Sequence, residues 1–267
     1  MKKFYISADI EGTCGIADWS ETEPGHPLYD YFARQMSREV AAACEGCFDA
    51  GADDVLVRDA HDTARNIRPD MLPERTRIFR GWENHPYSMM SGIDASFAGA
   101  IFTGYHSGAG MNTNPLSHTM NCQNNTVKLN GEICSELMMN CLTASMVGVP
   151  VACVCGDKGL CEWIASVIPG VATVPVLEGV GGGTISIHPD LAVKRIREAV
   201  KRAASGDLSA NLLYPMPDHF SLEINFKDHK RAHGAAYYPG CVMASDYTVA
   251  YEAADWMDAL KFIHWVL

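Results

Sequence analysis

The chain has 267 residues, 48% of them hydrophobic, and a formal net charge of −11. This length suits one large domain or two small ones with an ample core, and the composition is that of a soluble globular protein. The negative charge argues against nucleic acid or an anionic membrane as a partner. No apolar run approaches the roughly 20 residues of a membrane span, and the acidic Asp9 and Glu11 interrupt the region where a secretion signal would lie.

The ten cysteines are scattered among apolar neighbours, unlike the framework of a small disulfide-rich secreted protein. Cys44 and Cys47 form a CxxC pair, but no second pair follows and both fall within a helical pattern. We expect buried, reduced thiols, because free cysteine packs as a small hydrophobe. A reducing cytoplasm is the expected location.

Residues 4–10 predict a buried strand that ends in two carboxylates, Asp9 and Glu11. If both lie on the strand, their side chains point the same way, roughly 7 Å apart. Like charges at the edge of a buried element need a positive partner, and a divalent metal ion is the simplest one.

Helices then alternate with strands along the chain. Further strands are predicted at 54–59, around 78–79, and at 97–102, 127–131, 149–155, 171–177, 221–226 and 247–251. Helices are predicted at about 32–50, from about 132 to 146, and at 160–168, 189–204 and 255–267. The run 179–183 is expected to be a glycine-rich loop, and it lacks the Gly-Lys-Ser/Thr ending of a phosphate-binding loop.

This alternation predicts an α/β fold, a layered α/β/α sheet with a metal site at the strand ends. Residues 1–206 form the α/β domain that carries the metal site. Residues 207–267, with further strands and a closing helix, form either a smaller C-terminal α+β subdomain or the far half of the same fold.

Ligands bind beyond the carboxyl ends of the strands in open α/β sheets, and the acidic and imidazole residues gather there. His61 follows the second strand, His106 the strand at 97–102, and Glu136 is placed one turn into the helix from 132, beside Glu132. With Asp9 and Glu11 they form a ligand set suited to zinc, manganese or cobalt.

Five ligands exceed the three protein ligands of a typical catalytic zinc, so we expect two metal ions that share a bridging carboxylate. Asp9, the shorter and more deeply placed of the first pair, is the expected bridge. Two such ions polarise a carbonyl or phosphoryl oxygen. His118 follows a flexible loop, so we expect it to face the ions as a proton carrier or charge stabiliser.

The chain resembles the zinc-dependent D-aminopeptidases of the DppA type, also labelled dipeptide transport proteins. The similarity runs over nearly the whole chain in order, and its most specific segments are residues 7–12, 59–61, 104–106, 117–120 and 131–136.

This resemblance implies one zinc ion held by Asp9, Glu11 and His61 and a second held by Asp9, His106 and Glu136. It places the active-site histidine of the family at His118. It further implies hydrolysis of short peptides with an N-terminal D-residue, and a ring-shaped homodecamer that encloses the active sites. The loop at 107–115 is rich in Gly and Asn, and the glycine run at 179–183 matches no family motif.

Two other readings start from the same residues. The run Asp9-Ile10-Glu11-Gly12-Thr13 imitates the Asp-x-Asp-Gly-Thr motif of haloacid-dehalogenase-like phosphatases, with Asp9 as nucleophile and one magnesium ion. That reading leaves the two strand-end histidines without a role. The other is a non-catalytic peptide-binding or transport-accessory protein, but a purely structural metal site needs no open position.

Overall fold

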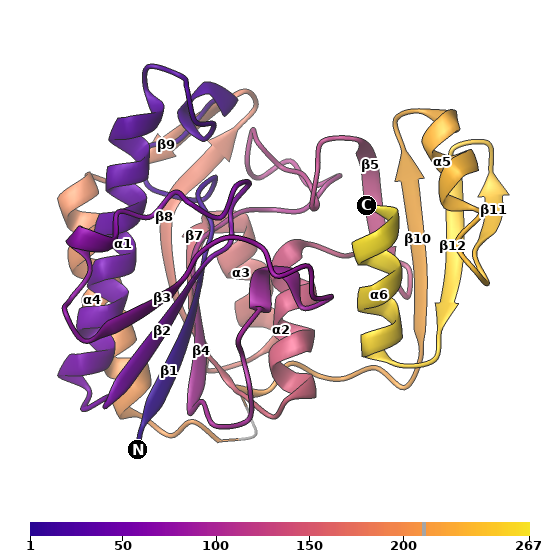
Figure 1. Cartoon of the computed structure of the whole chain (residues 1–267). Coiled ribbons are helices and arrows are strands. Elements are labelled where there is room, and N and C mark those ends of the chain that lie inside the picture. The colour runs from indigo at the N-terminus through magenta and orange to yellow at the C-terminus, as the bar shows by residue number, and fades with distance from the viewer. Residues whose placement is uncertain (210–211) are drawn as a thin grey trace.

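The computed structural model describes residues 1–209 and 212–267, which form a large lobe and a small lobe (Figure 1). The large lobe is built on a mostly parallel seven-stranded sheet in the order β3-β2-β1-β4-β7-β8-β9, in which only the β8–β9 pair is antiparallel. Its strands are β1 (Lys3–Ala8), β2 (Asp54–Asp59), β3 (Thr76–Phe79), β4 (Gly99–Tyr105), β7 (Val151–Asp157), β8 (Ala172–Val180) and β9 (Gly183–Ser186).

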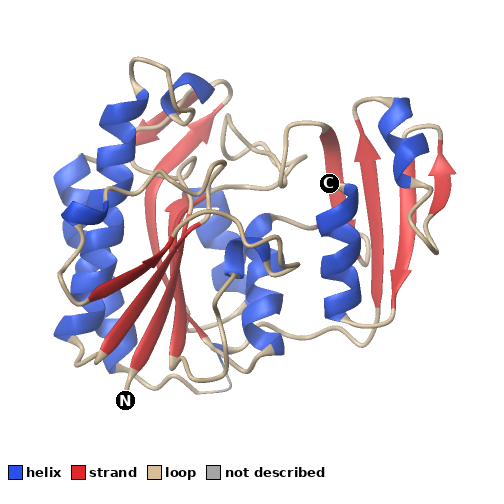
Figure 2. Cartoon of the chain, viewed as in Figure 1, coloured by secondary structure: helices blue, strands red, loops and turns tan. Residues whose placement is uncertain are grey.

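Helices cover both faces of this sheet (Figure 2). On one face, α1 (Tyr29–Asp49) and α4 (Pro189–Ser205) share a core with Phe4 and Ile6 of β1. On the other face, α2 (Glu136–Met146) and α3 (Lys158–Val167) share a core with Tyr5. Successive side chains of β1 therefore bury on opposite faces, as expected for a strand between two helical layers.

The small lobe is an antiparallel five-stranded sheet in the order β11-β12-β10-β5-β6. Two helices accompany it, and α6 lies between this sheet and α2 (Figure 1), where Trp256 Nε1 donates to Thr143 Oγ1 at 3.0 Å. These elements are β5 (Asn124–Leu129), β6 (Glu132–Ile133), β10 (Phe220–Phe226), α5 (His229–Ala235), β11 (Val242–Ser245), β12 (Thr248–Ala253) and α6 (Trp256–Val266).

The structure confirms the layered α/β architecture and adds the second, antiparallel sheet. Three short 3-10 helices complete the described elements, η1 (Trp19–Glu21), η2 (Pro69–Met71) and η3 (Ser88–Met90). A domain boundary at residue 206 stays a prediction, and the small sheet draws β5 and β6 from well before it. No helix in the described residues is long and apolar enough to cross a membrane.

Several predicted elements change in the structure. The first strand ends at Ala8 rather than Ile10, because the chain leaves β2 there and Asp9 N donates to Thr103 O. Glu132 lies in β6, so the helix begins only at Glu136, behind the N-cap Ser135. The glycine run at 179–183 belongs mostly to the β8–β9 hairpin.

The cysteine prediction holds. All ten cysteines are free thiols and only Cys122 is exposed. Cys44 and Cys47 both lie inside α1, and burial raises the pKa of Cys44 to about 12. They are therefore packing residues in this structure.

Candidate metal centre

The candidate centre lies where three neighbouring strands end. Asp9 and Glu11 follow β1, His61 follows β2 and His106 follows β4 directly. Glu136 reaches the same place from the first position of α2. The structure thus brings together all five residues that the sequence singled out as ligands, as the topology of a parallel sheet requires.

Two glycines allow the loops after β1 and β4 to touch. A Cβ atom on Gly12 would lie 1.9 Å from the carbonyl oxygen of Tyr105. Gly104 has φ +68°, and a Cβ there would lie 2.1 Å from the carbonyl oxygen of Asp9. Only glycine permits both the contact and the left-handed backbone, so these positions set how close Asp9 comes to His106.

Asp9 stands between two imidazoles. Its Oδ1 lies 3.4 Å from His61 Nδ1, and its Oδ2 lies 3.5 Å from His106 Nε2. Each imidazole has a second carboxylate, Glu11 Oε1 at 3.2 Å from His61 and Glu136 Oε2 at 3.4 Å from His106. Two groups of three ligands therefore share Asp9, and the ligand atoms in each lie within 4.8 Å of one another.

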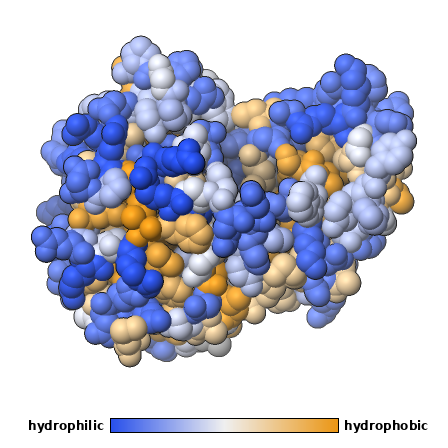
Figure 3. Space-filling model, in the orientation of Figure 1, coloured by the Kyte–Doolittle hydropathy of each residue, from blue (hydrophilic) through white to orange (hydrophobic). Residues whose placement is uncertain are grey.

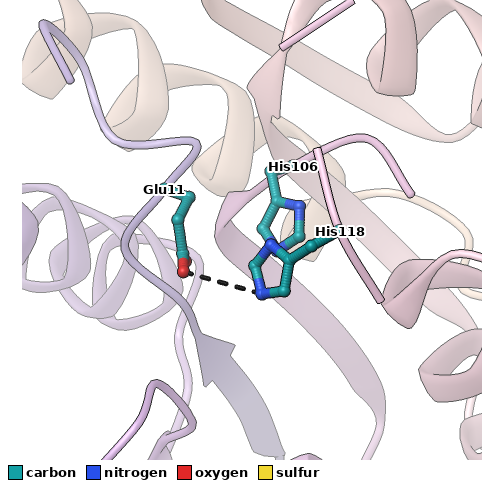
Figure 4. Close-up of side chains that lie close together, drawn as sticks. All are labelled: Glu11, His106 and His118. Atoms are coloured by element: carbon teal, nitrogen blue, oxygen red, sulfur yellow. Dashed lines mark ion pairs between the residues drawn. The ribbon is translucent and has the colours of Figure 1, made fainter. Parts of the chain in front are cut away.

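His118 faces two of these carboxylates from beside His106. Its Nε2 lies 3.8 Å from Glu11 Oε1 and 3.6 Å from Glu136 Oε1. The ring stacks on His106 with centroids 4.3 Å apart and 9° between the planes (Figure 4). His118 thus joins the cluster, and with Glu11 and His106 it forms a third group with metal-ligand spacing.

Backbone carbonyls orient all three imidazoles. Thr22 O lies 3.1 Å from His61 Nε2, Ser107 O lies 2.9 Å from His106 Nδ1, and Leu116 O lies 2.9 Å from His118 Nδ1. A carbonyl oxygen can only accept, so each of these ring nitrogens carries a hydrogen. In the neutral ring the other nitrogen then points a lone pair at the carboxylates, which is the arrangement of a metal-ligating histidine.

The candidate ligand residues are buried, and several of their polar atoms lack hydrogen-bond partners. Asp9, Glu11, His106 and Glu136 are each at most 4% exposed. Asp9 Oδ2, Glu11 Oε2 and His106 Nε2 have no hydrogen-bond partner in the structure. Buried polar atoms without partners are costly, and cations among these atoms would satisfy them. The residues therefore fit divalent metal ions.

The pKa shifts describe a site with too much negative charge. Burial and then the neighbouring Glu11 raise the pKa of Asp9 well above its ordinary value. Burial also opposes ionisation of Glu136, but the facing His106 lowers the pKa of Glu136 to about 2. Burial lowers the pKa of His61, but the carboxylates of Glu11 and Asp9 together raise it well above its ordinary value. Positive charge, from protonated imidazoles or from bound cations, would stabilise this cluster of carboxylates.

His118 differs from the other two imidazoles. Burial and then the nearby His106 lower its pKa. It is therefore the imidazole that stays neutral and able to accept a proton at neutral pH.

A hydrogen-bond network behind the site escaped the sequence analysis. Asp157, at the end of β7, accepts from Ser107 N at 2.6 Å and Ser107 Oγ at 2.8 Å. Ser107 in turn holds His106 through its carbonyl. Asn114 donates to Glu11 O at 3.3 Å and accepts from Leu116 N at 2.9 Å, which places the carbonyl that orients His118. Asp157 could have been found from its place at a strand end; Asn114, in a loop rich in Gly and Asn, offers no such signal.

The centre opens into a pocket of about 330 Å³. Asp9, Glu11, His61, His118 and Glu136 contribute to its lining. The other lining residues include Trp19, Glu23, Asp62, Trp82, Met120 and Cys122. The pocket gives a small substrate direct access to the buried cluster.

Comparisons with known proteins agree on one family. The family model described as Peptidase_M55, D-aminopeptidase, matches residues 1–265. A D-aminopeptidase of Bacillus subtilis (strain 168) is 29% identical over 261 residues, which cover 97% of this chain and 94% of that protein. The solved structure of the Zn-dependent D-aminopeptidase DppA from Bacillus subtilis, a self-compartmentalizing protease, superimposes with a TM-score of 0.91 at 27% identity, covering 99% of this chain and 96% of that one.

Proposed function

Since this chain belongs to the D-aminopeptidase family and is a zinc metallo-aminopeptidase, we propose that it removes the N-terminal D-residue from short peptides at a two-zinc centre. Asp9, Glu11 and His61 would hold one ion, and Asp9, His106 and Glu136 the other. The observation that supports this assignment is the orientation of the imidazoles. Each has one nitrogen committed to a backbone carbonyl and the other facing the buried carboxylates.

When bound, the zinc ions supply Lewis-acid polarisation of the scissile carbonyl and a water of lowered pKa. The protein's own part is to hold and move the proton. His118 is neutral, and its Nε2 faces the cluster at the pocket wall. That nitrogen can take a proton from the attacking water and return it to the leaving amine. His118 belongs to neither of the two ligand sets that share Asp9, although with Glu11 and His106 it forms a third group of metal-ligand spacing.

The two alternative functions gain no support from this site. In a phosphatase with Asp9 as nucleophile, His61 and His106 would have no task, yet both imidazoles face Asp9. In a non-catalytic peptide binder the metal ions would only hold the fold, and a purely structural metal site needs no ligands that open into a pocket, as these do.

We also propose that the chain forms a homo-oligomer that encloses its active sites, because its solved relative is a self-compartmentalizing protease. Ten subunits per ring is the number that the family resemblance implies. The free thiols fit a reducing cytoplasm.

Turnover of matched D-Ala-D-Ala and L-Ala-L-Ala, before and after removal of zinc with a chelator, tests the activity. The zinc-loaded protein should bind two ions per chain and hydrolyse the D-dipeptide faster. Chelation should abolish turnover and added zinc should restore it. Turnover that survives removal of zinc would contradict the metal mechanism, and faster hydrolysis of the L-dipeptide would contradict the stereochemical assignment.

Two variants separate ligand from proton carrier. Asp9→Ala should lose both ions because Asp9 is shared by both ligand sets. His118→Ala should keep both ions and lose about 10²–10⁴-fold in rate, the range for a general acid–base group. His219→Ala, at an exposed site in the described chain, is the control. Full turnover by His118→Ala would overturn its role, and loss of one ion would make it a ligand.

A further inference from the structure

A second cavity, of about 200 Å³, adjoins the metal pocket. Trp82 and Met120 line both, so the two spaces adjoin at these side chains. The remaining lining residues of the second cavity are Asn84, His85, Ser88, Ser91 and His264. We call this space the donor cavity.

The two spaces have opposite chemistry. Five carboxylates line the metal pocket, those of Asp9, Glu11, Glu23, Asp62 and Glu136. None lines the donor cavity among the described residues.

The polar groups of the donor cavity are an amide, two hydroxyls and two imidazoles. His85 Nδ1 accepts from Tyr87 N at 3.1 Å, so in the neutral ring Nε2 carries the hydrogen and can donate. These groups favour an anionic or hydrogen-bond-accepting ligand.

A buried cation lies behind the shared wall. The guanidinium of Arg58 stacks between the rings of Phe79, at 4.8 Å, and Trp82, at 4.3 Å. Arg58 is fully buried, and its Nε and Nη2 have no hydrogen-bond partner. The carboxylates of Asp59 and Glu83 act on its charge, but neither forms an ion pair with it in the described structure. Positive charge therefore lies close to the donor cavity.

One buried side chain in the wall of the donor cavity, that of Ser91, lacks a hydrogen-bond partner. Ser91 is 1% exposed, and its Oγ has no hydrogen-bond partner in the structure. A buried hydroxyl without a partner is costly unless a ligand or water completes it.

Backbone strain also gathers here. Asn84, Ser88 and Met120 have φ between 47° and 64°, and they are three of the six non-glycine residues with positive φ in the described structure. Strain of this kind persists where the surrounding structure holds it, often at ligand sites.

We propose that the donor cavity binds the C-terminal residue of the peptide substrate and accepts its free carboxylate, an assignment that rests on the proposed aminopeptidase activity. Glu23 and Asp62 follow Thr22 and His61 in the chain, so the acidic side lies at the His61 end of the centre. Met120 N donates to Glu136 Oε1 at 2.7 Å and Trp82 Nε1 donates to Asp62 O at 2.7 Å, so the donor cavity meets the metal pocket along both Met120 and Trp82.

A short peptide carries a positive charge at its N-terminus and a negative charge at its C-terminus, and the metal pocket and the donor cavity suit these two charges. Its ammonium suits Glu23 and Asp62, the pocket carboxylates outside the two proposed ligand sets, and its carboxylate suits the donor cavity. An extended dipeptide spans about 7 Å, so its carboxylate lies one residue beyond the bond that an aminopeptidase cleaves. The donor cavity thereby selects short substrates with a free C-terminus.

The test compares D-Ala-D-Ala with its C-terminal amide in zinc-loaded enzyme. The wild type should have a KM about tenfold lower for the free acid. In the double variant Asn84→Gly with Ser91→Ala, the KM for the acid should rise toward that of the amide, whereas the KM for the amide changes far less. Glycine tolerates the left-handed φ of 59° at position 84, so the amide is removed without added strain.

Asn130→Gly is the matched control, since Asn130 also has a positive φ of 51° but lies in the β5–β6 turn. It should keep the preference for the acid. An equal KM for acid and amide in the wild type, or a preference unchanged in the double variant, would overturn the inference. Failure of the zinc-loaded wild type to hydrolyse either substrate would instead contradict the proposed activity.

Discussion

At the scale of single residues, the site depends on backbone carbonyls that fix the orientation of its imidazoles. His61, His106 and His118 each lose one of two tautomers to a carbonyl contact. Metal binding therefore requires no change of tautomer, because the folded chain already holds each ring in the tautomer that binds a metal ion. Groups behind the ligands are thus part of the site.

Asp157→Asn tests that view. The amide oxygen keeps the N-cap contact to Leu160 N at the start of α3, but the NH₂ group that replaces Oδ2 cannot accept from Ser107 N. Ser107 should then hold His106 less firmly, and zinc affinity or turnover should fall about 10–100-fold. Competition with a chelator measures the affinity. Asp255→Asn, which caps α6 in the same way, is the control, and an unchanged affinity in Asp157→Asn would show that the contact does not position His106.

The residue types of the site could be predicted from sequence because each followed a recognisable strand. Asp9, His61 and His106 stand at strand ends, so the sheet itself brings them together. Their roles as zinc ligands stay a prediction. The roles of Asn114 and Ser107 could not be predicted, because their contacts depend on the path of an irregular loop.

At the scale of elements, α1 stabilises the loop after β1 through a buried carboxyl group. Glu39 is 1% exposed, and its Oε1 accepts from Cys14 N at 3.0 Å and from Gln35 Nε2 at 2.9 Å. Its Oε2 has no partner, and burial raises the pKa of Glu39 to about 7. Helix and metal-site loop are thus joined by a group that titrates near neutrality.

Glu39→Gln should change the pH dependence of stability. The folded state keeps the proton of Glu39 up to about pH 7, whereas the unfolded chain releases it near its ordinary pKa of about 4.3. Stability is therefore lost as the pH rises between these values, by about 3 kcal/mol in all. The variant should melt higher than wild type at pH 8 and similarly at pH 5.

Thermal unfolding at the two pH values measures this difference. Glu198→Gln, an exposed position on α4, is the control. An equal change in Tm at pH 5 and pH 8 would show that Glu39 does not titrate as described.

Elements with strong periodicity were predicted well, and their ends less so. Helix α1 and strand β2 follow their apolar patterns. Strand β11 was missed because all four of its residues are exposed and leave no alternation to detect. The helix predicted from Glu132 to 146 is present, but its predicted start is wrong, because the apolar pattern of α2 does not reveal the two-residue strand β6 before it.

At the scale of the whole molecule, the small lobe exposes several large apolar side chains. Tyr237, Val242 and Trp265 of the small lobe are 78%, 59% and 72% exposed. Figure 3 shows apolar side chains interrupting the hydrophilic surface of both lobes. Strand β11 also presents an unpaired sheet edge, and edges and apolar patches of this kind favour association.

The wild type should therefore migrate as a homo-oligomer in size-exclusion chromatography with light scattering. Val242→Glu combined with Trp265→Glu should shift it to smaller species, because added charge opposes burial of this surface in a contact between subunits. Leu28→Glu, at 53% exposure on the large lobe, provides a comparison. A wild-type monomer, or an unchanged mass in the double variant, would contradict assembly through this surface.

The order of strands in space could not be predicted, since local patterns carry no information on which strand lies beside which. The pairing of β5 with β10 places Leu129 opposite Leu222, and the sequence around either residue does not indicate that the two strands pair. Only the general rule for parallel sheets gave the position of the site.

That same pairing has a consequence for synthesis on the ribosome. The segment that leads from β5 and β6 into Glu136 emerges long before β10, its main neighbour in the finished sheet. Pairings between distant parts of a chain form slowly. The segment that carries Glu136 is therefore expected to take its final place at the metal pocket only when translation is nearly complete. A nascent chain would then acquire hydrolytic capacity late, after most of its length has left the exit tunnel.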